Sequence, residues 1–239
     1  MVAQSDTASL APSRTASRRA PRDYWVRIRD TIRYEGLLVL AWRTLMKCVS
    51  PLGRLELAIL YEMDLTRPIE RIRAKVETTL AQATPSDVKE LSDHTSSMPE
   101  ATIQRVQRGE VCFIARVGPR IVHSNWLSFR WKESLAGRFI VLDEDAAYCG
   151  DAYTDAAWRG LGIHTEVNST MLRFLQEKGF RRAYTWAYAD NRSSRKTMER
   201  VGWRRSGVML AFTPRRARQA HIWRISGRLD PFIGPRIPE

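Results

Sequence analysis

The feature that most constrains the fold is a strand–turn–helix unit between Ala146 and Lys178. Small or apolar residues alternate with polar ones over Ala146–Asp155, which is typical of a β-strand. The turn Arg159–His164 reads RGLGIH, and apolar residues then recur at helical spacing until Gly179, a residue type that commonly ends helices. Two glycines at a helix start let the backbone approach a ligand and aim free N–H groups at it, and the helix dipole favours an anion such as phosphate.

The glycine turn alone does not identify its ligand. No Gly-Lys-Ser/Thr sequence follows, so it is not a Walker loop, and it lacks the three-glycine spacing of a dinucleotide fingerprint. A plain connection between strand and helix remains the alternative to a phosphate-binding turn.

A second unit of the same kind lies downstream. Arg181–Tyr188 alternates as a strand, Asp190 and Asn191 open a short helix, and Gly202 with Trp203 closes it. Together the two units resemble the GNAT superfamily of acyl-coenzyme A-dependent N-acyltransferases. That family shows Arg/Gln-x-x-Gly-x-Gly/Ala at its pyrophosphate loop, and then Asn-x-x-Ser/Ala followed by an aromatic residue and Gly-Phe. The matching residues here are Arg159, Gly160, Leu161, Gly162, Ile163 and His164, then Asn191, Ser194, Gly202 and Trp203.

The resemblance covers roughly residues 73 to 226 and departs from the family pattern at two positions. His164 stands where the loop usually has its last small residue, which makes the helix start bulkier. Met198 stands where the family often has a tyrosine that acts as general acid, and a thioether cannot donate a proton. The second departure leaves the acid open between water, Tyr188 and Tyr153.

The resemblance implies a cofactor site formed by three segments. The pantetheine arm of acyl-CoA would pair with the backbone near Ala152, Tyr153 and Thr154, in a gap between two splayed strands. The pyrophosphate would rest on the amides of the loop from Arg159 to His164, where Arg159 could add positive charge. Asn191 and Ser194 would contact the cofactor near its thiol end. Acetyl-CoA is the simplest co-substrate.

The chemistry requires that a neutral amine attack the thioester carbonyl and lose a proton to a base. Asp151 and Asp145 are the first candidates for that base because they lie on or beside the predicted central strand, and Asp155 is the third. Each of these carboxylates could instead be structural or orient the substrate. His123 on the predicted hairpin could also serve, although an isolated strand histidine is more often simply hydrogen-bonded.

Charge and cysteine content narrow the class of protein. The net charge is +13, and from Lys178 to the end fifteen Lys and Arg stand against four acidic residues, which suits coenzyme A, a nucleic acid or an anionic surface. Alternatively, the positive charge belongs to an Arg-rich, solvent-exposed surface that binds no particular partner. Three cysteines, Cys48, Cys112 and Cys149, are too few and too dispersed for a disulfide framework, which favours a reducing cytoplasm. His94 and His221 show no ligand spacing, so we predict no metal site.

The N-terminal quarter differs from the rest. Residues 1–22 are rich in Ser, Ala, Thr and Arg and predict a disordered tail; a plain tail is favoured over a transit peptide, and there is no secretory signal. Tyr24–Tyr61 combines Trp, Leu and Ile with Arg and predicts an amphipathic helical extension over 23–71. Its longest apolar run is too short to cross a bilayer. The extension could pack on the acyltransferase-like domain or on a partner subunit, or it could lie peripherally at the inner membrane face.

The domain organisation follows from these segments. The acyltransferase-like domain spans 72–226, with a C-terminal tail over 227–239. Within it we predict a first strand over 75–83, helices after Thr84 and from Pro99, a hairpin of Val111–Val117 with Arg120–Phe129, and a last strand pair at 205–213 and 219–226. The fold class is therefore α/β, with a mixed, mostly antiparallel sheet flanked by helices.

Two functional hypotheses follow. The first is a cytoplasmic transferase that moves an acetyl or longer acyl group from acyl-CoA to a small amine or amino sugar. The second is a catalytically lapsed domain of the same fold that binds nucleic acid, a membrane surface or a protein partner. Aromatic residues among arginines, such as Trp186, Tyr188, Trp203 and Trp223, could stack on bases, but strand aromatics more often fill cores.

Overall fold

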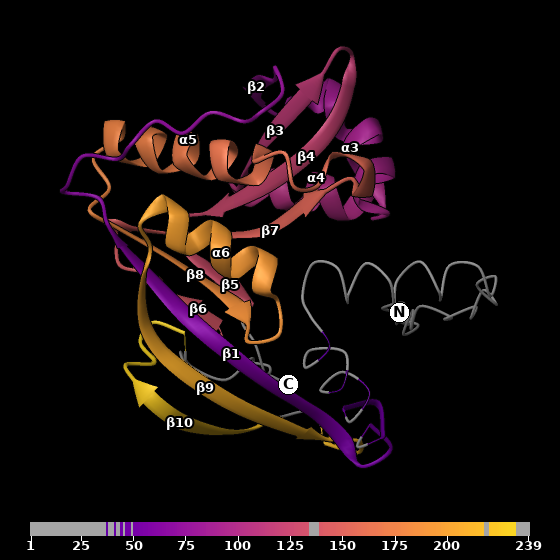
Figure 1. The fold of residues 1–239 in the computed structure, drawn as a ribbon, viewed down its shortest axis with the longest axis vertical. Helices are drawn as coiled ribbons and strands as arrows, with labels where there is room; N and C mark the ends of the chain where they lie inside the picture. Colours follow the sequence, from indigo (N-terminus) through magenta and orange to yellow (C-terminus); the bar gives the residue numbers. More distant parts are fainter. Residues whose placement is uncertain are drawn as a thin grey trace, which may run out of the picture.

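The structure is a computed structural model that describes residues 37, 41, 44, 46–48, 50–133, 139–217 and 220–232. Its centre is an eight-stranded sheet in the order β10-β9-β1-β8-β7-β4-β3-β2 (Figure 1). All neighbouring strands are antiparallel except β7 and β8. The strands of this sheet are β1 (Gly53–Asp64), β2 (Thr79–Gln82), β3 (Val111–Val117), β4 (Arg120–Ser128), β7 (Ala146–Thr154), β8 (Arg182–Tyr188), β9 (Arg204–Pro214) and β10 (His221–Gly227). The predicted mixed, mostly antiparallel α/β fold is confirmed.

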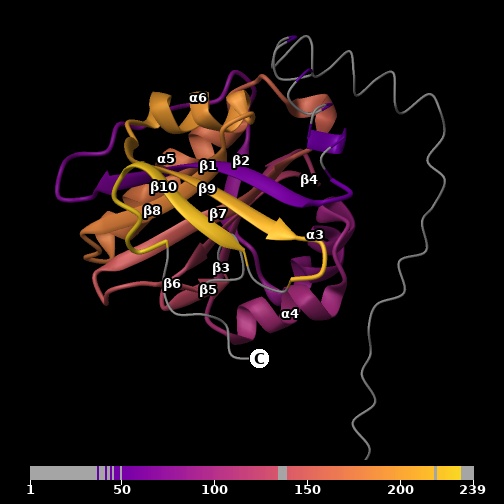
Figure 2. The same cartoon turned by 90° about the horizontal axis from the view of Figure 1, so that it is seen from below.

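Helices cover both faces of this sheet. The helices are α3 (Val88–Thr95), α4 (Pro99–Gln107), α5 (Ile163–Glu177) and α6 (Arg192–Val201), with 3₁₀ turns at Pro85–Asp87 and Ala156–Trp158. Figure 2 shows α5 and α6 on one side of the sheet and α3 and α4 on the other. We call these sides the α5 face and the α3 face. None of the described helices is long and apolar enough to cross a bilayer.

The core is divided between the two faces. On the α5 face, buried residues of α5, including Met171, Leu172 and Leu175, pack against the sheet. On the α3 face, one cluster lies under α3, and a second cluster surrounds Tyr148 and Tyr184. Phe232 is 1% exposed and belongs to the second cluster. The predicted C-terminal tail over 227–239 therefore begins with core residues.

The N-terminal strand β1 corrects the prediction of a helical extension over 23–71. Residues 53–64 form a central strand between β8 and β9, and Ala58–Tyr61 are buried on both faces. A short apolar run of this kind satisfies strand and helix patterns alike, which explains the error. Most of the remaining predicted extension, and all of the predicted tail over 1–22, lie outside the described residues.

Other differences are local. The predicted first strand over 75–83 is reduced to the four residues of β2, because residues 65–78 run beside α5 instead. Along this connection the Lys75 amide donates to the Leu161 carbonyl at 2.8 Å, and Gln176 Nε2 donates to the Leu65 carbonyl at 2.7 Å. A small second sheet of β5 (Trp131–Glu133) and β6 (Phe139–Val141) was not predicted.

Candidate active site

The parallel strands β7 and β8 separate along their length. They pair only where Ala146–Tyr148 lie opposite Arg182–Tyr184. Beyond these residues β7 pairs with β4 as far as Thr154, and β8 pairs with β1 as far as Tyr188. The edges of β7 and β8 that face each other there have no partner strand among the described residues. We call the region between residues 149–154 and 185–188 the β7–β8 opening (Figure 1).

The glycine turn lies between β7 and the first turn of α5. Gly160 and Gly162 have φ values of +81° and +82°, in the left-handed region that favours glycine. Gly162 caps α5 without a side-chain bond, and the amides of Leu161 to His164 have no acceptor within the described part of the chain. A Cβ at Gly160 would meet no heavy atom within 4 Å. These free donors at a helix N-terminus fit an anion such as the pyrophosphate of a coenzyme. Arg159 is held at the same turn because its Nε donates to the Thr154 carbonyl at 3.0 Å.

His164 and His123 lie against each other beneath this turn, with ring centroids 5.2 Å apart. His123 is fully buried, and its Nδ1 is 2.7 Å from Thr154 Oγ1. Burial lowers the pKa of His164 to about 4. Burial and the neighbouring imidazoles of His164 and His94 hold the pKa of His123 well below its usual value. Both rings are therefore neutral at pH 7, and His123 faces the inside of the protein under α5 rather than the α3 face.

Helix α6 begins beside the end of β8. Asn191 caps it, because Oδ1 accepts from the Ser194 amide at 3.0 Å. With Oδ1 engaged in the cap, Nδ2 is the other polar atom of the Asn191 side chain. Met198 is 4% exposed and packs in the cluster on the α5 face, so this position supplies packing.

The three candidate carboxylates occupy different places. Asp145 precedes β7 at the end where β7 and β8 are paired, and Arg182 NH2 is 3.2 Å from its Oδ1. Asp155 is only 14% exposed and is held by Arg120 at 2.9 Å, with His94 Nδ1 at 3.1 Å. Of the three, Asp151 alone lies on β7 within the β7–β8 opening, and its side chain is half-exposed.

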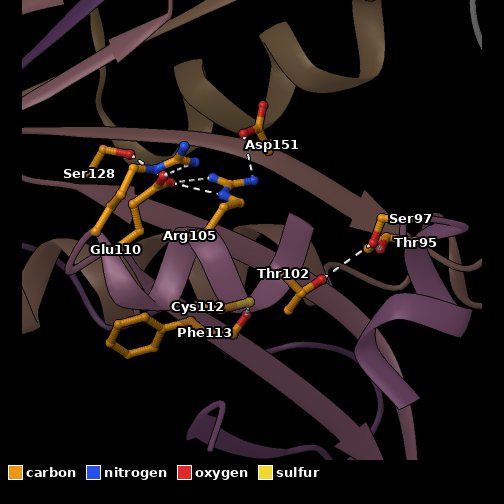
Figure 3. Close-up of polar contacts among 10 residues, drawn as sticks. Thr95, Ser97, Thr102, Arg105, Glu110, Cys112, Phe113, Ser128 and Asp151 are labelled. Atoms are coloured by element: carbon orange, nitrogen blue, oxygen red, sulfur yellow. Dashed lines mark hydrogen bonds and ion pairs between the residues drawn. The ribbon is translucent and has the colours of Figure 1, made fainter. Parts of the chain in front are cut away.

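Asp151 has an unusual backbone and a defined partner. It lies with Ala152 at a bulge, where the pairing of β4 with β7 shifts around Asn125. Its φ of +54° is uncommon for a residue other than glycine. Figure 3 shows Arg105 of α4 between Asp151 and Glu110. Arg105 NH1 is 3.0 Å from Asp151 Oδ2, and this contact places the carboxylate on the α3 face.

Arg105 is fixed by further contacts. Its NH2 lies 2.6 Å from Glu110 Oε2, and its guanidinium lies 3.9 Å from the centroid of the Trp126 ring. Ser128 and Arg108 also donate to Glu110 (Figure 3 shows Ser128). The network positions a carboxylate and a guanidinium together beside the opening. Sequence reasoning missed Arg105 and Glu110 because nothing local connects them with Asp151.

Two tyrosines line the α3 face of the opening. The Tyr188 hydroxyl donates to Glu56 Oε1 at 2.8 Å, and burial together with this bond raises the pKa of Tyr188 to about 12. Of the three acids left open by the sequence, Tyr188 is thus weakened by its surroundings. Tyr148 was not predicted; burial, followed by the charge of Asp151, raises its pKa well above 10. The Tyr148 ring lies over Gly150, where a Cβ would come within 2.4 Å of it.

Metal ligands are not grouped in the described residues, which contain no set of three or more His, Cys, Asp or Glu side chains able to hold an ion.

The family model described as the acetyltransferase (GNAT) family matches residues 78–203, more than half of the chain. No curated protein matches the chain. Among solved structures, a GCN5-related N-acetyltransferase from Sphaerobacter thermophilus is 14% identical with a TM-score of 0.50, over 82% of this chain and 58% of that one. A GNAT-family acetyltransferase from Novosphingobium aromaticivorans DSM 12444 is 17% identical with a TM-score of 0.49, over 68% of this chain and 66% of that one.

A third similar structure is an aminoglycoside acetyltransferase from an uncultured soil metagenomic sample, in complex with sisomicin. It is 14% identical with a TM-score of 0.43, over 52% of this chain and 87% of that one. At such identities structural likeness concerns the fold alone, while the family model rests on the sequence itself. On that match, which includes both glycine turn and capping asparagine, the chain belongs to the acetyltransferase (GNAT) family.

Proposed function

We propose that this protein transfers an acyl group from acyl-CoA, most simply acetyl-CoA, to the amine of a small molecule. The observation that carries the proposal is the coincidence of the β7–β8 opening with the free amides at the start of α5. Strand edges without partners can pair with the amide groups of a pantetheine arm, and the helix start can bind its pyrophosphate. Proteins of this family generally use acetyl-CoA, which matches both features.

The cofactor would contact three groups of residues. Main-chain groups of Ala152, Tyr153 and Thr154 lie along the opening on β7. The amides of the turn from Arg159 to His164 follow directly, and the Arg159 side chain adds a positive charge to them. Asn191 and Ser194 lie at the start of α6, where the Asn191 Nδ2 group can donate to the cofactor.

The reaction would proceed by direct attack. The nitrogen of the neutral amine bonds to the thioester carbonyl carbon, and the carbon–sulfur bond breaks as the tetrahedral intermediate collapses. Asp151 accepts the proton that the nitrogen loses, directly or through water. The thiolate leaves and takes a proton from water or from Tyr153, the two acids that remain because Met198 cannot supply a proton and Tyr188 is a weakened acid.

Arg105 has two effects on this step. Its ion pair with Asp151 holds the carboxylate in place and balances its negative charge. Glu110 and Trp126 fix Arg105 from the other side. The acceptor would approach from the α3 face, since Asp151, Tyr148 and Tyr188 all lie there.

The test is calorimetric titration of the purified protein with acetyl-CoA, followed by a thiol-release assay with spermidine, glucosamine and kanamycin as amine probes. The proposal expects saturable binding, and an acetylated product whose mass is raised by one acetyl group. A folded protein that binds neither acetyl-CoA nor longer acyl-CoAs would contradict it. Binding to DNA or RNA that falls steeply with salt, without acyl-CoA binding, would favour the lapsed binding module instead.

A further inference from the structure

Strand β1 carries a buried carboxylate that the proposed reaction has not used. The strand lies outside the region matched by the family model, yet it pairs with both β8 and β9. Glu56 is 6% exposed. It points to the α3 face, because Ala58 and Leu60, two and four residues further on, belong to the cluster on that face.

The hydrogen bonds of Glu56 are concentrated on one oxygen. Tyr188 donates to Oε1 at 2.8 Å, and Arg54 NH2 lies 2.6 Å from the same atom. Arg54 also donates to the Tyr188 hydroxyl at 2.9 Å. No described residue hydrogen-bonds to Oε2, and this oxygen is not fully enclosed by the protein. This second oxygen thus keeps its capacity to accept hydrogen bonds.

The charge of Glu56 is incompletely compensated. A carboxylate buried to this extent normally requires a cation and several donors. Its counter-ion Arg54 is 69% exposed, so water screens much of their attraction. A second cation that reaches Oε2 would complete the site.

The position of this carboxylate relates it to the β7–β8 opening. Tyr188 is the last residue of β8, and it packs with Trp186 against the cluster that contains Tyr148. The Trp186 and Tyr188 rings are 4.9 Å apart. The Tyr148 ring lies over Gly150, the residue before Asp151, so the cluster connects the two sides of the opening. Asp151 thus flanks the opening on the β7 side and Glu56 with Tyr188 on the β8 side.

We propose that Glu56 and Tyr188 bind the ammonium group of the acceptor before it reacts; this inference rests on the proposed acyl transfer. Glu56 Oε2 accepts an N–H bond from the cation, and the rings of Trp186 and Tyr188 offer their faces to it. The chemical class is a primary amine that arrives protonated. The ammonium loses its first proton to solvent before attack, and Asp151 accepts the second proton, which the nitrogen loses once it has bonded to the carbonyl carbon. β1 therefore supplies acceptor recognition to a cofactor site built from the rest of the sheet.

The variant Glu56→Gln keeps the shape of the side chain and removes its charge. We expect the KM for whichever amine probe the wild type acetylates to rise about tenfold or more, as for loss of a hydrogen bond to a charged group. The Kd for acetyl-CoA should stay within about twofold of the wild-type value. Glu62→Gln is the matched control, because Glu62 lies on the same face of β1, six residues further along, and pairs with Arg228.

Tyr188→Phe gives a second variant that keeps the ring and removes the hydroxyl. It should raise the same KM by about two- to tenfold, and it tests the site if Glu56→Gln does not fold. An unchanged amine KM in a folded Glu56→Gln protein would overturn the inference while leaving the acyltransferase proposal intact. Binding of acetyl-CoA by a wild type that acetylates none of the amine probes would also overturn it. Absence of acetyl-CoA binding would instead contradict the underlying function.

Discussion

The two sides of the β7–β8 opening are built in different ways. The β7 side is contiguous in sequence: strand, glycine turn and α5 follow one another within residues 146–177. The β8 side depends on β1, and its contact between Glu56 and Tyr188 joins residues 132 positions apart. A local unit can be identified from its pattern, whereas a long-range contact requires the topology of the sheet. The side that we propose binds the cofactor could therefore be predicted from the sequence, whereas the side that we propose binds the acceptor becomes visible only in the structure.

The largest effect should come from Asp151→Asn, which separates chemistry from cofactor binding. Asparagine tolerates the positive φ of this position, so the bulge should persist. We expect kcat/KM to fall by about 100-fold or more through loss of the base, with the Kd for acetyl-CoA unchanged. Steady-state kinetics and calorimetry measure the two quantities.

Asp143→Asn is the control for this variant, since Asp143 is 70% exposed and lies at the paired end of the strands. It should behave as wild type. A greater loss in Asp145→Asn than in Asp151→Asn would contradict our assignment and move the base to the closed end.

A smaller effect concerns the histidine layer under the cofactor turn. The unfolded chain holds histidines with a pKa near 6.5, whereas folding lowers the pKa of His164 to about 4 and that of His123 as well. The unfolded state therefore binds more protons as pH falls below about 6.5. Stability should be full above that pH and decline between pH 7.5 and 5 by about 2 kcal/mol for His164, with a further decline in the same direction from His123.

Urea unfolding at the two pH values measures this decline. His164→Phe keeps a ring in place and removes one titrating group, so it should show a weaker dependence on pH. An equal decline in His164→Phe and wild type would show that His164 does not titrate in this range.

The smallest effect should come from Asn191, where capping and cofactor contact can be separated. Asn191→Ala removes the bond to the Ser194 amide and should lower the free energy of unfolding by about 1 kcal/mol. Asn191→Asp keeps the cap but replaces the amide nitrogen, so it should keep stability and raise the Kd for acetyl-CoA by about two- to tenfold. Wild-type affinity in Asn191→Asp would show that this residue is only a helix cap.

Much of the fold was predictable because its elements carry local patterns. The β3–β4 hairpin, β7, α5, β8 and α6 are where the alternation, the glycines and the capping asparagine place them. Strand β1 was not predicted because Ala58–Tyr61 is buried on both faces of the sheet and shows no alternation of apolar and polar residues. Its neighbours β8 and β9 are more than a hundred residues away in the chain.

The candidate site shows the same division. The turn from Arg159 to His164 could be identified from its glycines, and the burial of His164 against His123 could not. The sequence places Asp151 on a predicted strand and so makes it a candidate base. We prefer it to Asp145 only because the structure shows that β7 and β8 stop pairing at Tyr148, which leaves Asp151 beside the opening. The burial of Glu56 could not be predicted from the sequence, since an acidic residue in an amphipathic segment is normally exposed to solvent.

The most direct test of the cofactor site is calorimetric titration with acetyl-CoA of the wild type, Gly160→Trp and Gly179→Trp. The two glycines have nearly equal φ values, +81° and +85°, and a Cβ at either meets nothing within 4 Å, so both variants bear the same backbone cost. Thermal unfolding checks that they remain folded. We predict that wild type and Gly179→Trp bind acetyl-CoA alike and that Gly160→Trp does not bind it. Equal binding by Gly160→Trp and wild type, or absence of binding by all three, would contradict a cofactor site at the start of α5.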